Sequence, residues 1–512
     1  MLLEELALTS ARLSETPGRR AKIELLAACL RRVRPEEVSV AVAYLSGALP
    51  QGTAGVGWAS LRDLPAPATA EPSLELLDVD SALERIKAAT GKGSQAARRQ
   101  ELAQLFICAS EPERAFLIHL LTGELRQGAL EGVMLEAVGS AAGVASSDIR
   151  RAFMVAGDLG PVAAAALAGG APALASFHLR VLSPVRPMLA QTADNAADAM
   201  QRIHPAAVEW KLDGARIQVH VLSGQVRAFT RTLADVTDRM PEIVDAVTRL
   251  PLDAAILDGE AIALRGDGRP HPFQVTGSRF ASRPNVEHQS RSALLSPFFF
   301  DCLHLDGDDL IDRPALDRLS IMDDRLPESL RVPRSIVEDA PAAERFLDDA
   351  LVHGHEGVMV KSLDAPYEAG RRGAGWLKVK RAHTLDLVVL AAEWGHGRRR
   401  GWLSNLHLGA RDPSSDGFVM LGKTFKGMTD VMLAWQTETL RAMETSHDEY
   451  TVYVRPELVV EVAFDGLQSS SRYPSGLALR FARVKGYRHD KGPEDADTIE
   501  TVRAIHAGTS TS

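Results

Sequence analysis

Residues 209–216 read Glu-Trp-Lys-Leu-Asp-Gly-Ala-Arg, and they stand directly before Ile-Gln-Val-His-Val-Leu at 217–222. In the second run apolar and polar residues alternate, which is typical of a β-strand with one buried face. Ile217, Val219 and Val221 would share that face. A lysine beside Asp-Gly is common in surface turns, so the first run gains meaning only from the segments that follow it.

Five further segments follow in order along the chain, and each combines charged or aromatic residues with a short apolar run. They are LDGE at 257–260, FFFD at 298–301, EGVMVK at 356–361, WLKVK at 376–380, and RFAR at 480–483, which continues to RHDK at 488–491. The apolar runs are bounded by turn residues and therefore predict strands. The charged residues would then lie at strand ends and in turns.

These residue types suit the transfer of a phosphoryl or nucleotidyl group, which needs a nucleophile, cations for the developing charge, and positioning. A lysine amine attacks only when it is deprotonated. Lys378, Lys380 and a nearby bound metal would favour the neutral form of Lys211. Magnesium prefers oxygen ligands and few protein carboxylates, so Glu260 and Glu356 are candidate metal contacts.

The order of the motifs resembles that of the covalent nucleotidyltransferase superfamily, and specifically its ATP-dependent DNA ligases. That family carries KxDG, DGE, an aromatic-rich strand, EGVMVK, WLKxK and a C-terminal RxDK, all of which occur here in that order. The runs at 91–94 and 123–132 look like the helical DNA-binding domain of the same ligases. Ala482 and Gly486 depart from the family's last motif, where many relatives have a proline and an arginine. We therefore expect one phosphate or DNA contact to be absent there.

The resemblance implies roles for individual residues. Lys211 would be the nucleophile that carries AMP, while Glu209 would accept from the adenine amino group and Phe300 would stack on the base. Arg488 and Lys491 would orient the pyrophosphate leaving group, and Lys378 and Lys380 would be catalytic cations. The positions that match nucleotide-lining residues of the family are Glu209, Arg216, Arg231, Glu260, Phe300, Arg372 and Lys378, with Arg371 as the alternative to Arg372.

The chain divides into a helical first third and a strand-rich remainder. Apolar residues recur at helical spacing within 21–33, and Ser110 with Glu113 has the spacing of a capping box. We expect a multidomain protein with an all-α DNA-binding domain at 1–176. An α+β adenylation domain with antiparallel sheets would follow at 177–383. A C-terminal β-barrel of the OB-fold type would occupy 384–512, because that fold commonly binds nucleic acid.

The formal net charge of −9 does not by itself indicate a nucleic-acid-binding protein. Any DNA-binding surface must therefore come from local clusters of lysine and arginine, and two such clusters occur at 371–401 and 472–491. In the first domain, glycines near Ser94 would let backbone amides approach phosphates at the start of a helix. The candidate DNA contacts are Lys92, Ser94, Arg126, Arg398, Arg399 and Arg400.

The cysteines, the N-terminal charges and the apolar runs indicate in which cellular compartment the protein works. Cys29, Cys108 and Cys302 lie far apart and predict neither a disulfide framework nor a four-cysteine zinc site. Glu4 and Glu5 stand where a signal peptide would carry positive charge. No run approaches the roughly 20 apolar residues of a membrane span. We expect a cytoplasmic, nucleoid-associated protein.

The sequence therefore predicts an ATP-dependent DNA ligase that uses ATP and Mg²⁺. It would act as a monomer on nicked double-stranded DNA in repair, replication or recombination. Alternative functions are an mRNA-capping-like guanylyltransferase, which shares KxDG, and a catalytically inactive DNA-binding scaffold. The helical N-terminal domain weighs against the first, and the presence of Lys211, Glu260, Glu356 and Lys378 weighs against the second. An NAD-dependent ligase would need a four-cysteine zinc site.

Overall fold

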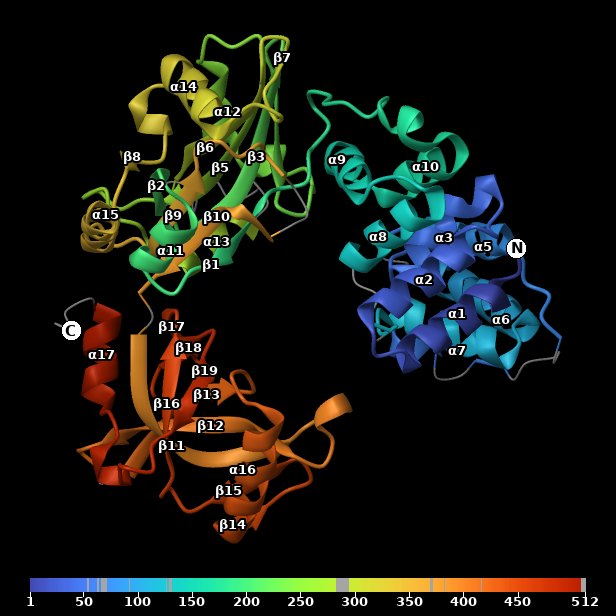
Figure 1. The fold of residues 1–512 in the computed structure, drawn as a ribbon. Helices are drawn as coiled ribbons and strands as arrows, with labels where there is room; N and C mark the ends of the chain where they lie inside the picture. The colour runs from blue at the N-terminus through green and yellow to red at the C-terminus, as the bar shows by residue number, and fades with distance from the viewer. Residues whose placement is uncertain are drawn as a thin grey trace.

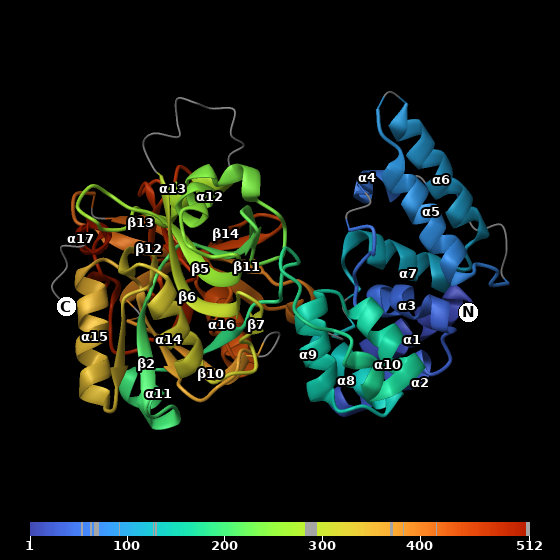
Figure 2. The same cartoon turned by 90° about the horizontal axis from the view of Figure 1, so that it is seen from above.

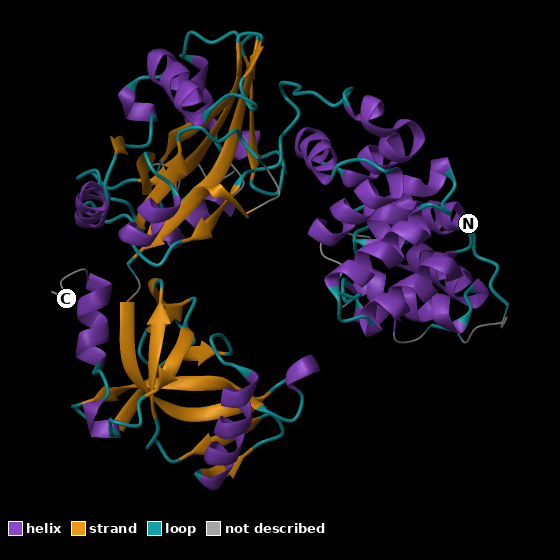
Figure 3. Ribbon diagram, viewed as in Figure 1, coloured by secondary structure: helices purple, strands orange, loops and turns teal. Residues whose placement is uncertain are grey.

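The computed structural model describes the whole chain apart from residues 53–54, 62–63, 66–70, 92, 126, 129–130, 282–293, 369–371, 382, 416 and 508–512. The candidates Lys92, Arg126 and Arg371 lie outside the described residues, as do the side chains of Arg372 and Arg398. The described residues form three bodies, one helical and two built on sheets (Figures 1 and 3). The helical body stands beside the other two when the molecule is seen from above (Figure 2).

The first body is helical, as the sequence predicts, and surrounds one apolar cluster that includes the fully buried Leu6, Tyr44 and Phe106. Its 21–33 periodicity belongs to a helix that starts at Arg19 and ends at Leu30. One half of the predicted capping box is formed, because the Ser110 amide donates to Glu113 Oε2 at 2.9 Å, whereas the Ser110 hydroxyl has no hydrogen-bond partner among the described residues. The helices are α1 (Leu3–Glu15), α2 (Arg19–Leu30), η1 (Pro35–Glu37), α3 (Val38–Leu45), α4 (Trp58–Leu61), α5 (Leu76–Ala88), α6 (Ser94–Cys108), α7 (Glu111–Thr122), α8 (Glu131–Ala142), α9 (Ser146–Ala156) and α10 (Leu159–Leu174).

The second body contains two five-stranded sheets, with strand orders β1-β10-β9-β2-β8 and β4-β3-β5-β6-β7. Neighbouring strands are antiparallel except β1 and β10, which are parallel. The strands are β1 (Leu189–Thr192), β2 (Ala206–Lys211), β3 (Ala215–Leu222), β4 (Gln225–Thr230), β5 (Ala254–Ala263), β6 (Leu295–Leu305), β7 (Asp308–Asp309), β8 (Arg334–Val337), β9 (Gly357–Ser362) and β10 (Arg372–Lys380). The helices are α11 (Ala196–Arg202), η2 (Thr237–Arg239), α12 (Pro241–Thr248), α13 (Phe273–Ala281), α14 (Ala315–Arg325), η3 (Glu328–Leu330) and α15 (Ala340–Val352).

The third body is a β-sheet domain, and the closed barrel expected for it is not confirmed. Its seven-stranded sheet runs β13-β12-β11-β15-β14, with β16 between β11 and β19, while β17 and β18 form a separate hairpin. The strands are β11 (His383–Trp394), β12 (Leu403–Asp412), β13 (Gly417–Thr424), β14 (Glu444–His447), β15 (Thr451–Val454), β16 (Val459–Phe464), β17 (Gly466–Ser469), β18 (Leu477–Arg480) and β19 (Arg483–Tyr487). The helices are η4 (Gly397–Arg399), α16 (Asp430–Ala442), η5 (Pro493–Asp495) and α17 (Ile499–Ala507). No helix in the described parts of the chain is long and apolar enough to cross a membrane.

Strand β3 departs from the expectation of one buried face. Ile217 is buried as predicted, but Gln218 and His220 on the other face are buried as well. The segment that leaves the helical body covers them, because the Leu182 amide donates to His220 Nδ1 and the Val185 amide donates to Gln218 Oε1. Burial lowers the pKa of His220 to about 3, so the imidazole is neutral and can accept that bond.

The same connecting segment joins the helical body to the second body. Arg151 of α9 forms a two-bond ion pair with Asp312, at 2.5 and 3.1 Å. Arg186 of the segment pairs with Glu131 of α8 at 2.7 Å. Beneath these pairs lies a shared apolar cluster that includes Met154, Val155, Val185, Met188, Ile256, Tyr367 and Trp376. These contacts hold the helical body against the two sheets of the second body, which line the site described below.

Gly357, at the start of β9, offers a test of this packing. Its φ is +147°, and a Cβ there would collide with the carbonyl oxygen of Val379 on β10. We predict that Gly357→Ala lowers the free energy of unfolding by about 2–4 kcal/mol through backbone strain and overpacking. Gly266→Ala is the control, because a Cβ at that turn meets nothing within 4 Å. Denaturant unfolding curves that overlay for the two variants would contradict the register assigned to β9 and β10.

Candidate active site

A cavity of about 490 Å³ opens between the two sheets of the second body and the β17–β18 hairpin of the third. It gathers residues from segments that are far apart in the sequence. The predicted site residues that line it are Glu209, Lys211, Arg216, Arg231, Glu260, Phe300, Glu356, Lys378 and Lys380. The quoted motifs from KLDG to WLKVK therefore converge on one space.

At the centre of the cavity, one carboxylate lies between two ammonium groups. Glu356 Oε2 is 2.5 Å from Lys211 Nζ and 2.8 Å from Lys380 Nζ. The backbone sets this geometry, because Lys211 ends β2 opposite Gly357 and its carbonyl accepts from the Glu356 amide at 3.2 Å. Burial alone would raise the pKa of Glu356, but attraction to the two lysines outweighs it and holds the pKa below 4.5.

Glu260 of β5 also lines this part of the cavity and has the opposite electrostatic balance. Burial raises its pKa from 4.5 to about 7, although the charges of Lys211 and Arg216 lower it. The turn before β3 passes close to it, since a Cβ on Gly214 would come within 2.8 Å of Glu260 Cγ. The glycine of KLDG is therefore required by close approach to β5.

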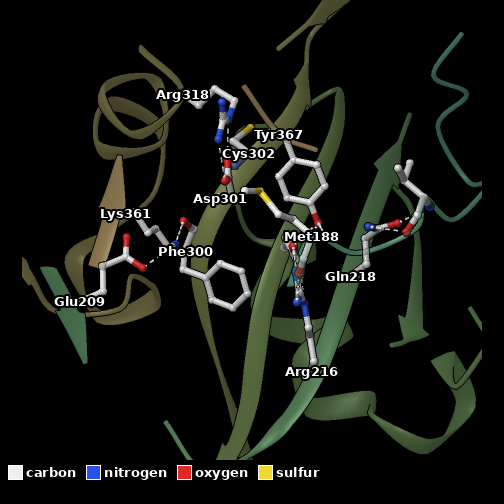
Figure 4. Close-up of polar contacts among 12 residues, drawn as sticks. Met188, Glu209, Arg216, Gln218, Phe300, Asp301, Cys302, Arg318, Lys361 and Tyr367 are labelled. Atoms are coloured by element: carbon white, nitrogen blue, oxygen red, sulfur yellow. Dashed lines mark hydrogen bonds and ion pairs between the residues drawn. The ribbon is translucent and has the colours of Figure 1, made fainter. Parts of the chain in front are cut away.

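Glu209 and Phe300 lie at another end of the cavity, and both contact Lys361. Lys361 Nζ is 2.5 Å from Glu209 Oε2 and donates to the Phe300 carbonyl at 3.0 Å (Figure 4). The ammonium also lies 4.5 Å from the Phe300 ring centroid and 4.4 Å from that of Trp376. Sequence reasoning included Lys361 in EGVMVK but gave it no role. A charged residue that ends an otherwise apolar strand was the available signal.

Arg216 is held in a network that the sequence did not reveal. Its guanidinium makes two bonds to Asp258, at 2.6 and 3.0 Å, and donates to the carbonyl of Met188 at 2.6 Å (Figure 4). The Tyr367 hydroxyl donates to the same Asp258 carboxylate at 2.6 Å. The guanidinium carbon lies 5.3 Å from the Phe300 ring centroid. Asp258 and Tyr367 therefore fix where Arg216 meets the cavity.

The third body closes the cavity through ion pairs with the second. Arg480 Nη1 lies 2.6 Å from Asp213 Oδ2, which is the aspartate of KLDG. Lys380 lies 3.3 Å from Asp465 of the third body, and Arg483 also pairs with that carboxylate at 3.1 Å. The Arg480–Asp213 and Lys380–Asp465 contacts were not predicted, because they depend on how two domains face each other.

Arg488 and Lys491 are not brought to the cavity. Both pair with Asp386 of β11, Arg488 at 3.0 Å and Lys491 at 2.5 Å. Arg488 also pairs with Asp490 at 2.7 Å. In this arrangement of the domains the C-terminal motif contributes Arg480 and Phe481 to the cavity, and its last four residues lie elsewhere on the third body.

The candidate DNA contacts that the structure describes lie on two bodies. Ser94 begins α6, directly after Gly93, whose φ is +89°. Arg399 lies in the turn after β11 and donates to the Phe425 carbonyl, and the neighbouring Arg400 is exposed. None of these three residues lines the cavity. Arg231 does, and it is exposed at the turn that follows β4.

The two carboxylates proposed to contact a metal, Glu260 and Glu356, both line the cavity. Among the described residues, no group of three or more histidine, cysteine, aspartate or glutamate side chains is arranged to hold a metal ion. Magnesium is commonly held by one or two carboxylates together with substrate phosphates and water. The donor set therefore fits a cation that arrives with a phosphate ligand.

Comparison with known proteins gives a consistent result over the whole chain. Residues 187–380 match the ATP-dependent DNA ligase domain, 399–491 the C-terminal region of such ligases, and 59–139 the DNA ligase N-terminus. A probable DNA ligase of Anaeromyxobacter sp. (strain Fw109-5) is 59% identical and covers 99% of this chain and 98% of its own. One from Mycobacterium sp. (strain KMS) is 56% identical, with 99% of each chain covered. The solved structure Pmar-Lig_PreS3 has the same fold, with a TM-score of 0.65 at 18% identity, over 95% of this chain and 99% of its own.

The electrostatics of the cavity give a pH prediction. We expect the Glu260 carboxyl of the free protein, in buffer without metal or nucleotide, to titrate near pH 7. Lys211→Ala should move that midpoint upward, because removing a positive charge destabilises the carboxylate. Carboxyl-¹³C NMR titration measures both, with Glu260→Gln to assign the signal. A midpoint near 4.5 in the unmodified protein would contradict the burial described for this site.

Proposed function

The chain belongs to the family of ATP-dependent DNA ligases, and on that premise we propose that it attaches AMP to Lys211 before it seals a nick. The observation that carries the proposal is the convergence of Lys211, Glu356, Lys378 and Lys380 on one cavity that also holds Glu209 and Phe300. A nucleophile, several cations and a site for a base are then available to a single nucleotide.

In the first step the neutral Lys211 amine attacks the α-phosphorus of ATP. Lys211 has by then given up its ammonium proton to solvent. A P–N bond forms, the P–O bond to the β-phosphate breaks, pyrophosphate leaves, and the nitrogen loses one further proton as the phosphoramidate forms. Lys380 shares Glu356 with Lys211 and, like Lys378, supplies positive charge where the phosphorus gains negative charge. Glu209 accepts from the adenine amino group, Phe300 stacks on the base, and Arg216 and Arg231 contact the nucleotide.

Glu260 and Glu356 would hold Mg²⁺ together with phosphate oxygens of the nucleotide. The cation supplies charge neutralisation and polarises the phosphoryl oxygens. Both ammonium groups contact Oε2 of Glu356, so the cation would compete with the two lysines only at that oxygen. Arg372 belongs to the same proposal as a nucleotide contact at the start of β10.

Two later steps complete the reaction on nicked double-stranded DNA. AMP passes from Lys211 to the 5′-phosphate, and the 3′-hydroxyl then attacks that phosphate and expels AMP. We place the DNA contacts at Lys92, Ser94, Arg126, Arg398, Arg399 and Arg400. With Arg480 of the third body on Asp213, the hairpin lies over the nucleotide site, and we assign this domain arrangement to the steps on DNA.

The remaining features of the proposal follow from this use of three domains. We take residues 1–176 as the DNA-binding domain, 177–383 as the adenylation domain and 384–512 as an OB-fold domain. A single chain then surrounds the duplex as a monomer, in the cytoplasm and associated with the nucleoid, in repair, replication or recombination. A capping guanylyltransferase and an inactive scaffold are not favoured, because ligases match this chain over 99% of its length.

The nucleophile is tested by mapping the adduct. After incubation with ATP and Mg²⁺, the unmodified protein should gain one AMP on the peptide that contains Lys211, as read by mass spectrometry. Lys211→Ala should gain none, because Lys380, the other amine on Glu356, reaches it from β10 and is also paired with Asp465. As the control, Lys423→Ala removes a lysine of the third body that pairs with Glu393, and it should label normally. An adduct on another lysine would refute the assignment.

The division of labour between the domains gives a second test. Arg488→Ala and Lys491→Ala should nearly abolish adduct formation, because pyrophosphate exists only in the first step. Both variants should still seal a nick that already carries AMP on its 5′-phosphate. Lys378→Ala should fail in both assays, since a cation near the α-phosphate is useful whenever that phosphorus changes partner. If Arg488→Ala loses single-turnover sealing as badly as Lys378→Ala, the proposed roles are wrong.

A further inference from the structure

Lys361 is a buried cation with an unusual set of contacts. Its side chain and that of Glu209 are only 2% and 1% exposed. A buried lysine is costly unless it is paired and hydrogen-bonded, and here one ammonium pairs with Glu209 and donates to the Phe300 carbonyl. The same ammonium lies against the Phe300 and Trp376 rings. Lys361 therefore touches both groups proposed to meet the base.

The two oxygens of Glu209 are used differently. Oε2 is 2.5 Å from Lys361 Nζ, whereas Oε1 is buried and has no hydrogen-bond partner among the described residues. The guanidinium of Arg334 in β8 lies 3.7 Å from Oε1, beyond hydrogen-bond distance. A buried oxygen without a donor is expensive, so this atom is suited to a donor that arrives with a ligand. Glu209 lines the cavity, where such a ligand would lie.

The charge of Glu209 depends on the groups that face it. Burial raises the pKa of Glu209 above its ordinary value; Lys361 of β9 and Arg334 of β8 lower it without cancelling that rise, and Asp301 of β6 adds to it. Arg334 is shared with Asp323, at 2.5 Å, and Asp301 is shared with Arg318, at 2.7 Å. Lys361 is thus the cation in direct contact that opposes the desolvation of this carboxylate.

We propose that Lys361 selects the nucleobase by holding Glu209 as a carboxylate, with Oε2 occupied and Oε1 left as an acceptor. This proposal rests on the proposed function, in which the cavity takes a nucleoside triphosphate. An acceptor matches the exocyclic amino group of adenine and is mismatched to the carbonyl oxygen at the same position of guanine. A protonated Glu209 would instead offer a donor, and the preference for adenine would weaken. Lys361 does not touch the reacting phosphorus, so it is a positioning residue.

The test is Lys361→Met, with rates of adduct formation measured against ATP and GTP concentration between pH 6 and 8.5. We expect the KM for ATP to rise by about 10- to 100-fold at low pH, as for loss of a hydrogen bond to a charged group. It should recover as pH rises, because Glu209 ionises again. The maximal rate should change far less, and the preference for ATP over GTP should fall by at least about tenfold. Lys361→Arg should restore both the preference and the pH profile.

Arg279→Met is the matched control, because Arg279 and Glu242 form a largely buried pair outside the cavity lining, with exposures of 13% and 14%, and neither faces Glu209. It should lose stability but keep the base preference and a flat pH profile. If Lys361→Met does not fold, Glu209→Gln serves instead. Its amide carries both a donor and an acceptor and cannot titrate, so it should lose the preference equally at every pH.

Three results would overturn the proposal: an unchanged ATP preference in Lys361→Met, a Lys361→Arg variant that behaves like Lys361→Met, or an unchanged preference in Glu209→Gln. Mapping the adduct of the unmodified protein distinguishes failure of the Lys361 proposal from failure of the proposed function. Adduct on Lys211 with an unaltered preference in the variants contradicts only the role of Lys361. Absence of adduct on Lys211 in the unmodified protein contradicts the function on which it rests.

Discussion

The Glu356 carboxylate, shared between Lys211 and Lys380, is the interaction on which the rest of the site depends. It joins the end of β2, the start of β9 and the end of β10, and Lys380 extends the chain of charges to Asp465 in the third body. One largely buried carboxylate therefore connects three strand ends, and Lys380 connects them to a second domain. Losing Glu356 would remove the carboxylate that both lysines share in a largely buried space, which is costly.

Around Glu356 the cavity has two parts, one suited to phosphates and one suited to a base. Glu356, Glu260 and the lysines form a charged end suited to phosphates, whereas Glu209 and Phe300, held by Lys361, form an end suited to a flat base with an amino group. Arg216 lies between them, fixed by Asp258 and by the connecting segment that runs back to the helical body. The position of the first body is thereby linked to the nucleotide site through backbone contacts.

The sequence predicted the convergence of the motifs well, because residues at strand ends are ordered by the strands themselves. Lys211 and Glu356 could be found in this way. The partners of Arg216 and Glu209 could not, since they come from strands that are neighbours in the sheet but far apart in the sequence, and from the connecting segment. The burial of Gln218 and His220 was missed for the same reason: that segment covers a face which alternation alone leaves open. The location of Arg488 on Asp386 depends on domain orientation, which no local pattern encodes.

The most direct measurement is a crystal structure of the protein after incubation with ATP and Mg²⁺. We predict continuous electron density from Lys211 Nζ to a single phosphorus, with the adenine ring against Phe300 and its amino group within hydrogen-bond distance of Glu209. Density for AMP on a different lysine, or a base that lies away from Glu209 and Phe300, would contradict the assignment of the cavity.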